Sequence, residues 1–198
     1  KEMGYKGFKI HIWEDYSISE LVKTILKVRE CVGDGFPLML DPACKLRTFT
    51  EVLLIGQACG EANYLWLEDA YRDSGVSTTA HKMLRQRLKT PILQTEHVRG
   101  LEEHVNFIVA EGTDFVRADA EYDGGVTGAS KIAHASEGFG LDVELHGPHP
   151  AHRQLMAGIR NSNFYEMSLV HPKTSEIGRC MDIYADSYKD GLSCICLL

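Results

Sequence analysis

Short apolar runs recur along this chain at a nearly constant spacing, and longer helical patterns fill the intervals. Seven runs begin 23 to 30 residues apart, which is the length of one strand, one helix and two short loops. The runs occupy residues 7–12, 37–41, 63–68, 91–96, 114–119, 141–146 and 164–169. Because strands that alternate with helices form parallel sheets with the helices outside, the spacing predicts an α/β fold.

Capping boxes mark the starts of two of the predicted helices. Ser17 and Glu20 have capping-box spacing, and so do Thr48 and Glu51, each pair ahead of an apolar helical pattern. Two further helical patterns, each closed by a glycine, cover residues 100–112 and 125–138. The helices therefore fall between the predicted strands, as a strand-helix repeat requires.

Two architectures fit this alternation, an open doubly wound sheet and a (β/α) barrel. A doubly wound sheet predicts a glycine-rich phosphate loop after an early strand, but the glycine-rich segment 123–128 follows the fifth run and lacks the GxGxxG spacing. A barrel instead places functional side chains at the C-terminal ends of many strands. This chain has ionisable residues at those ends, so we expect a (β/α) barrel of the TIM type.

Every predicted strand ends on, or just before, an ionisable residue. These residues are Lys9, His11, Asp41, Glu68, Glu96, Asp119, His146 and Glu166. Strand ends in a barrel converge on one mouth, where like charges repel unless a cation or a proton holds them. Because Asp41, Glu68 and Glu96 end three consecutive strands, they predict an all-oxygen site for a hard cation such as Mg²⁺. We interpret the neighbouring Asp69 as a charge on the outer face or in the loop.

Two pairs of residues are candidates for acid-base chemistry. Lys9 and His11 are separated by one residue, so on a strand their side chains face the same side. Asp119 and His146 end neighbouring strands, so we expect them within hydrogen-bond reach. A carboxylate in that position would orient the imidazole and raise its basicity.

Composition excludes several other classes of protein. The net charge is −7, whereas nucleic-acid-binding domains usually carry an excess of basic residues. No apolar run approaches the roughly 20 residues of a membrane helix, and the N-terminal residues lack the apolar core of a signal peptide. The six cysteines (31, 44, 59, 180, 194 and 196) form no CxxC pair. We interpret them as reduced core or surface thiols of a cytoplasmic protein, rather than as metal ligands.

Taken together, these motifs resemble the enolase superfamily, in its mandelate racemase and sugar-acid dehydratase branch. The resemblance runs from about residue 5 to about residue 172, and the spacing from Asp119 through the GGVT segment to His146 matches that of the family. The motifs that carry it are Lys9-Ile10-His11, Leu40-Asp41, Trp66-Leu67-Glu68-Asp69, Thr95-Glu96, Arg117-Ala118-Asp119, Gly124-Gly125-Val126-Thr127, Glu144-Leu145-His146-Gly147 and Tyr165-Glu166.

The resemblance implies metal-assisted removal of the proton α to a carboxylate. Residues at the positions of Asp41, Glu68 and Glu96 would hold Mg²⁺, which would stabilise the enediolate. Asp119 and His146 would form the acid-base dyad, and Glu166 would bind the carboxylate of the substrate. The implied reaction is dehydration of a small sugar acid to a 2-keto-3-deoxy acid, in a parent protein that forms a homo-oligomer.

Two departures from the family pattern affect this reading. The Lys-x-Lys motif of the family is Lys9-Ile10-His11 here, so the second base is a histidine or is absent. The Asp-x-Asn motif is Asp41-Pro42-Ala43, which removes a polar group beside the metal. The alternative reaction, racemisation or epimerisation of a 2-hydroxy acid, needs two comparable bases and is weakened by the histidine.

A third hypothesis is a zinc hydrolase on the same barrel. His146, His149 and His152 lie close together in the sequence, but the middle strands end in carboxylates rather than in the histidines that such hydrolases use. We therefore expect His149 to contact substrate and His152 to lie on a helix surface. A fourth hypothesis is a remnant without enzymatic activity.

The ends of the chain predict a fragment. Residues 1–172 supply about seven of the eight strands of a barrel, and the N-terminal capping domain of the family is missing. Residues 173–198 form a tail that we expect to be partly non-native. Since an incomplete barrel has unpaired strand edges, we expect these 198 residues expressed alone to aggregate or to have little activity.

Overall fold

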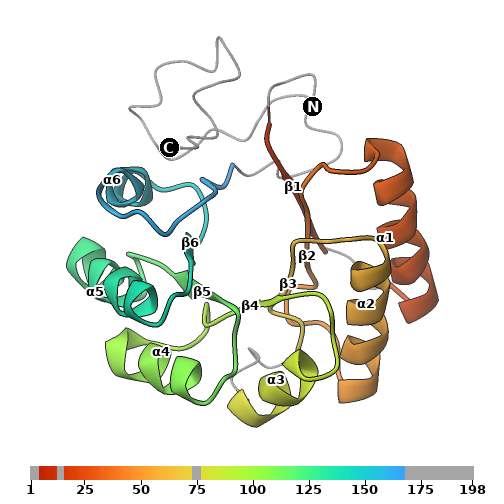
Figure 1. Ribbon diagram of the computed structural model, residues 1–198, viewed down its shortest axis with the longest axis horizontal. Coiled ribbons are helices and arrows are strands. Elements are labelled where there is room, and N and C mark those ends of the chain that lie inside the picture. Colours follow the sequence, from red (N-terminus) through yellow and green to blue (C-terminus); the bar gives the residue numbers. More distant parts are fainter. Residues whose placement is uncertain (1–4, 13–15, 73–76, 168–198) are drawn as a thin grey trace. The chain divides into compact units, whose positions relative to one another are not determined.

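The computed structural model describes residues 5–12, 16–72 and 77–167 (Figure 1). Its contacts divide the chain into two compact units. The N-terminal unit comprises Lys6–Val98 and Asn106–Phe115, and the C-terminal unit comprises Lys1–Tyr5, Arg99–Val105 and Val116–Leu198. Six strands follow one another in chain order, from β1 to β6, and strands alternate with helices throughout the described residues. The α/β class and the strand-helix repeat predicted from the sequence are confirmed.

The N-terminal unit holds four parallel strands and the helices between them. The strands are β1 (Phe8–His11), β2 (Leu38–Asp41), β3 (Trp66–Glu68) and β4 (Ile92–Gln94), and the helices are α1 (Ile18–Val32), α2 (Phe49–Glu61) and α3 (Thr78–Arg85). The register pairs His11 with Asp41, and Glu68 with Leu93. All four residues of β2 are buried, as expected for a parallel strand that is covered on both faces.

The first two helices begin where the capping boxes predict. The side chain of Ser17 accepts a hydrogen bond from the backbone of Glu20, and Thr48 does the same for Glu51, with both reciprocal bonds present. Helices α1 and α2 pack side by side outside β1–β3 (Figure 1). Ile25, on α1, is fully buried in the core that they cover. These elements give the strand ends of this unit a fixed frame.

The C-terminal unit contains β6 and all of β5 except its first residue, with a helix after each strand. β5 (Phe115–Ala118) pairs with β6 (Val143–Leu145). Helix α5 (Gly125–Gly138) follows β5, and α6 (Pro150–Gly158) follows β6. Helix α4 (Gly100–Val109) lies where a helix was predicted, and its residues divide between the two units. None of the helices in the described part of the chain has the length and hydropathy needed to cross a membrane.

The seventh predicted strand is wrong over its described part. Residues 164–167 adopt no strand, and residues 168 and 169 lie outside the described residues. The side chain of Glu144 explains the difference, because its carboxylate accepts the backbone N–H groups of Asn163 and Phe164, at 3.2 and 3.0 Å. Those N–H groups are therefore unavailable to a neighbouring strand. The predicted tail, residues 173–198, also lies outside the described residues.

Candidate active site

Carboxylates collect at the C-terminal ends of the strands in the N-terminal unit. Asp41 is the last residue of β2, Glu68 is the last residue of β3, and Glu96 follows β4 by two residues. Asp41 is 4% exposed and Glu68 is fully buried. Since two buried carboxylates repel each other, this arrangement requires positive charge nearby.

Lys9 supplies one positive charge to these carboxylates. Its Nζ lies 3.1 Å from Glu68 Oε2 and 3.7 Å from Asp41 Oδ2. His11 Nε2 also lies 3.7 Å from Asp41 Oδ2, so both residues point to the same side of β1, as the alternation along the strand predicts. Burial raises the pKa of Asp41 well above its usual range, the charge of Glu68 raises it further, and Lys9 opposes both effects.

Glu68 and Glu96 lie together with Asp69, which was not predicted to be a metal ligand. One ligand oxygen from each of Glu68, Asp69 and Glu96 lies within 4.8 Å of the others. Asp41 is not a member of that group, although the sequence predicts that it joins Glu68 and Glu96. The donors are all carboxylate oxygens, and they fit a hard divalent cation such as Mg²⁺.

The interpretation of Asp69 as an outer-face or loop charge is wrong. Asp69 is 2% exposed, and the side-chain amide of Gln94 donates a hydrogen bond of 2.7 Å to its Oδ1. The strand ends at Glu68, and Asp69 has a φ of 38°. Because the alternation of a strand no longer applies at such a backbone angle, it could not predict the side to which Asp69 points.

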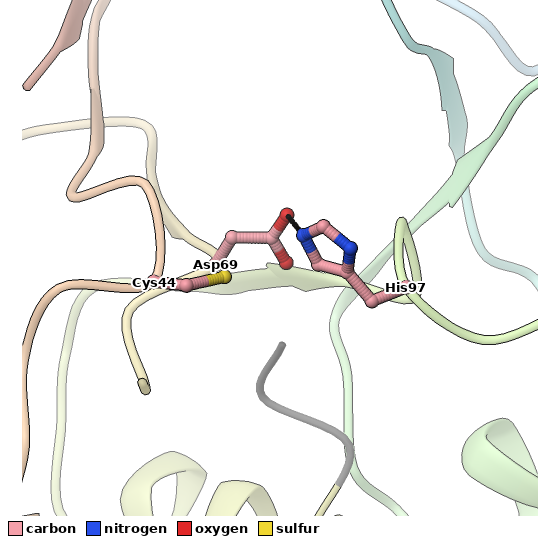
Figure 2. Close-up of side chains that lie close together, drawn as sticks. All are labelled: Cys44, Asp69 and His97. Atoms are coloured by element: carbon pink, nitrogen blue, oxygen red, sulfur yellow. Dashed lines mark ion pairs between the residues drawn. The ribbon is translucent and has the colours of Figure 1, made fainter. Parts of the chain in front are cut away.

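A second cluster next to these carboxylates contains Cys44, Asp69 and His97 (Figure 2). Their ligand atoms all lie within 4.8 Å of one another, and His97 Nε2 is 3.3 Å from Asp69 Oδ2. Hydrogen bonds with Asp69 and Cys44 raise the pKa of His97 to about 10. This cluster was not predicted from the sequence, although each member lies within three residues of a predicted metal ligand.

A pocket of about 250 Å³ lies beside the loop that follows β2. Pro42, next to Asp41 in the chain, lines this pocket together with Lys45 and Arg47. Apolar side chains such as Leu21 and the carboxylate of Glu51 line the rest of the pocket, so its lining does not select for an anion.

The C-terminal unit brings together the two residues of the predicted acid-base pair. His146 Nδ1 lies 2.7 Å from Asp119 Oδ2, so the expected hydrogen-bond reach is present. Burial raises the pKa of Asp119, but contacts with His146 and His152 and the backbone N–H of Glu121 outweigh it, and the net pKa lies well below the usual range. Asp119 is therefore a carboxylate that holds the imidazole by its Nδ1 atom.

Asp123 fixes the backbone that carries Asp119. Its carboxylate accepts the N–H of Asp119 at 2.9 Å and the N–H of Gly100 at 3.2 Å. The chain turns tightly here, since a Cβ atom on Gly128 would lie 1.6 Å from the carbonyl oxygen of Asp123. The glycine-rich segment after β5 thus allows close backbone packing at the start of α5.

Two histidines of α6 and its cap differ in their surroundings. The expectation that His152 lies on a helix surface is wrong, because it is 1% exposed and its Nε2 lies 3.2 Å from Asp119 Oδ1. Its Nε2 also accepts the backbone N–H of Ala120 at 2.9 Å. His149 caps α6 by accepting the N–H of Ala151 at 3.1 Å. His152 is buried because its ring contacts Asp119 and Ala120, which follow β5. The sequence around a single histidine does not reveal such a distant contact.

Glu166 is held by two donors of its own unit. Arg117 Nη2 donates to Glu166 Oε1 at 2.8 Å, and the backbone N–H of Gly147 donates to Glu166 Oε2 at 2.8 Å. Arg117 is fully buried and also donates to the carbonyl oxygen of Leu145. This role of Arg117 was not predicted from the sequence, although an arginine in a buried strand needs a carboxylate partner.

Glu144 is a buried carboxyl group whose ionisation opposes folding. Burial raises its pKa from 4.5 to about 7, although hydrogen bonds from Asn163 and Phe164 and the charge of Arg117 oppose the shift. A carboxyl group with a raised pKa binds its proton more tightly in the folded state than in the unfolded state. Its contribution to stability is therefore complete below pH 4.5 and is lost as the pH rises to about 7.

We expect the free energy of unfolding of the wild-type protein to fall, relative to that of Glu144→Gln, by about 3 kcal/mol between pH 4.5 and pH 7. Glutamine cannot ionise, so the variant lacks this proton linkage even though it weakens the bonds to Asn163. Urea titrations across this pH range measure the difference. The matched control is Glu103→Gln, which changes an exposed carboxylate on α4. A constant difference between wild type and Glu144→Gln would contradict the expectation.

The chain is similar in sequence to a known protein family and to several enzymes. Residues 1–192 match the model of the family described as enolase C-terminal domain-like. The L-talarate/galactarate dehydratase of Salmonella typhimurium is 30% identical over 160 residues, which are 79% of this chain and 38% of that protein. The N-succinyl-L-Arg/Lys racemase of Bacillus cereus is 26% identical over 144 residues, 73% of this chain and 38% of that protein.

A solved structure gives a similar fold. The D-glucarate dehydratase of Agrobacterium tumefaciens, crystallised with magnesium, has a TM-score of 0.81 and 27% identity, and the match covers 93% of this chain and 47% of that chain. The chain therefore spans less than half the length of each of these proteins.

Proposed function

Because the chain belongs to the enolase C-terminal domain-like family, we propose that the whole protein is a Mg²⁺-dependent sugar-acid dehydratase. It would remove the proton α to the carboxylate and eliminate the β-hydroxyl, which gives a 2-keto-3-deoxy acid. The observation that carries the proposal is the pair of buried carboxylates that end β2 and β3, Asp41 and Glu68, together with the partly exposed Glu96 two residues after β4. Relatives named as dehydratases and a dehydratase crystallised with magnesium support it.

Asp41, Glu68 and Glu96 would hold the magnesium ion in this proposal. A bound Mg²⁺ supplies a positive charge that polarises the carboxylate of the substrate and stabilises the oxyanion formed from it. The position of Lys9 supports the pairing of Asp41 with Glu68, since its Nζ lies 3.7 Å from Asp41 Oδ2 and 3.1 Å from Glu68 Oε2. We assign the third position to Asp41, which ends β2, rather than to Asp69, which also contacts Gln94 and His97.

His146 would move the proton. Asp119 accepts a hydrogen bond from Nδ1, at 2.7 Å, and leaves Nε2 of the ring as the basic atom. Asp123 accepts the backbone N–H of Asp119, and the backbone N–H of Glu121 donates to the Asp119 carboxylate, so both the chain and the side chain of Asp119 are held in place. We assign Lys9 and His11 as candidate acid-base groups on the N-terminal unit, and Glu166 and His149 as substrate-binding groups.

The alternative function is racemisation or epimerisation through the same proton abstraction. It is favoured by the N-succinyl-L-Arg/Lys racemase among the relatives and by the presence of a second base candidate, Lys9, beside the carboxylates. Both reactions begin with the loss of an α proton. They differ in whether the product contains a keto group.

The full-length protein should be tested against a library of sugar acids, with and without Mg²⁺. We expect a 2-keto product from at least one acid, formed only when the divalent cation is present. Inversion at the α-carbon without a keto product would favour the racemase. Absence of both products across the library, in a folded protein with Mg²⁺ bound, would overturn the proposal.

A further inference from the structure

We propose that Cys44, Asp69 and His97 form a second metal site, which binds a thiophilic divalent cation of the zinc class. The three side chains point toward one another (Figure 2), and their ligand atoms lie within 4.8 Å of each other. This site is distinct in its chemistry from the carboxylate group and does not depend on the proposed dehydratase activity. It also revises the interpretation of the cysteines as thiols without a metal role.

The donor set decides which cation fits. A thiolate, an imidazole nitrogen and a carboxylate oxygen are zinc ligands, whereas three carboxylates suit magnesium. Three protein ligands with one open position are also the pattern of zinc sites that bind water or a substrate. Cys44 and His97 are each partly exposed, so an ion has a route of entry. Binding would replace the thiol proton of Cys44 and a ring proton of His97, which pass to solvent.

Neighbouring groups hold the middle ligand in place. Asp69 is 2% exposed, and Gln94 donates to its Oδ1 at 2.7 Å, so that Oδ2 remains directed toward His97 Nε2 at 3.3 Å. A partner that orients a metal-binding carboxylate in this way is usual in metal sites. The hydrogen bond from Gln94 therefore already orients Asp69 as a metal ligand would need to be oriented.

A backbone hydrogen bond joins Cys44 to Asp69. The N–H of Cys44 donates to the carbonyl oxygen of Asp69 at 2.7 Å. Cys44 and Asp69 have φ values of 57° and 38°, and Thr95, two residues before His97, has a φ of 99°. Non-glycine residues with such angles persist where the surrounding structure enforces them, and they occur often at ligand sites. The loops after β2, β3 and β4 therefore each contribute one ligand, and each loop contains at least one residue with such an angle.

Asp69 belongs to both groups of potential ligands. One group joins it to Cys44 and His97, and the other joins it to Glu68 and Glu96. Since we assign Asp41 to the magnesium site, Asp69 remains available to the thiophilic cation. The two sites are therefore separable by substitution at Cys44, which belongs only to the zinc-class group.

Cobalt titration of the purified full-length protein tests the proposal. Co²⁺ bound by a thiolate gives a sulfur-to-metal charge-transfer absorption, and Zn²⁺ added afterwards should abolish it. We expect the absorption in the wild type and in Cys31→Ser, which changes an exposed free cysteine on α1. We expect its loss in Cys44→Ser, and at least about a tenfold weaker Zn²⁺ affinity in His97→Gln. Absorption that persists in Cys44→Ser would overturn the proposal.

A second measurement needs no variant and so is independent of folding defects. Alkylation of the wild-type protein, followed by peptide mass spectrometry, reports the accessibility of each thiol. Zn²⁺ should slow the alkylation of Cys44 and leave that of Cys31 unchanged, while Mg²⁺ should protect neither. Equal labelling of Cys44 with and without Zn²⁺ would contradict the site. The result does not depend on turnover, so it stands apart from the outcome of the sugar-acid assay.

Discussion

Replacing His146 with asparagine is expected to lower turnover by about 10²- to 10⁴-fold, the range typical of a lost general base. Asparagine keeps an N–H group that can donate to Asp119, but it has no basic nitrogen corresponding to Nε2. Because the asparagine amide can replace the hydrogen bond of 2.7 Å between His146 and Asp119, we expect the fold to change little. Steady-state rates at saturating Mg²⁺, measured on the full-length protein, give the effect.

Mg²⁺ affinity provides the control in the same variant. His146 is not among the carboxylates assigned to the metal, so titration calorimetry should give a nearly unchanged dissociation constant for Mg²⁺. His134→Asn is the matched control substitution, because His134 is exposed on α5, and it should retain the wild-type rate. If His146→Asn turned over at the wild-type rate, His146 would have no part in the mechanism.

Local sequence signals predicted those elements whose causes are local. The capping boxes at Ser17 and Thr48 specify helix starts through bonds within four residues, and both helices begin there. The carboxylates at Asp41 and Glu68 were placed by strand periodicity, which holds as long as the backbone stays extended. Such features need no knowledge of distant parts of the chain.

The errors occurred where a distant partner or a change of backbone angle decided the outcome. Asp69 lies one residue beyond the end of β3 with a φ of 38°, so periodicity could not place its side chain. His152 is buried against Asp119, which is 33 residues away in the sequence. The run at residues 164–169 has the pattern of a strand, but Glu144 accepts the N–H of its first residue, Phe164, and that of Asn163 before it. These contacts depend on tertiary packing, which one sequence does not reveal.

Glu68→Gln is expected to produce the second large loss, a decrease in Mg²⁺ affinity of more than about 100-fold, since even contacts behind a metal ligand are worth 10- to 100-fold. Glutamine has nearly the same shape as glutamate, but it removes the negative charge that a cation needs. Glu68 is fully buried, and its Oε2 already accepts the indole N–H of Trp66 at 3.1 Å and the ammonium of Lys9 at 3.1 Å. The neutral side chain therefore weakens the hold on any positive charge at this position.

Two further variants assign the third magnesium ligand. Asp41→Asn should weaken Mg²⁺ binding strongly, because we assign Asp41 to the metal beside Glu68 and Glu96. Asp69→Asn should affect Mg²⁺ much less and should abolish the thiolate absorption of bound Co²⁺. The reverse pattern, with Mg²⁺ lost in Asp69→Asn and retained in Asp41→Asn, would assign the magnesium ion to the group of Glu68, Asp69 and Glu96. Because asparagine preserves the size of aspartate, thermal unfolding of both variants distinguishes a lost ligand from a lost fold.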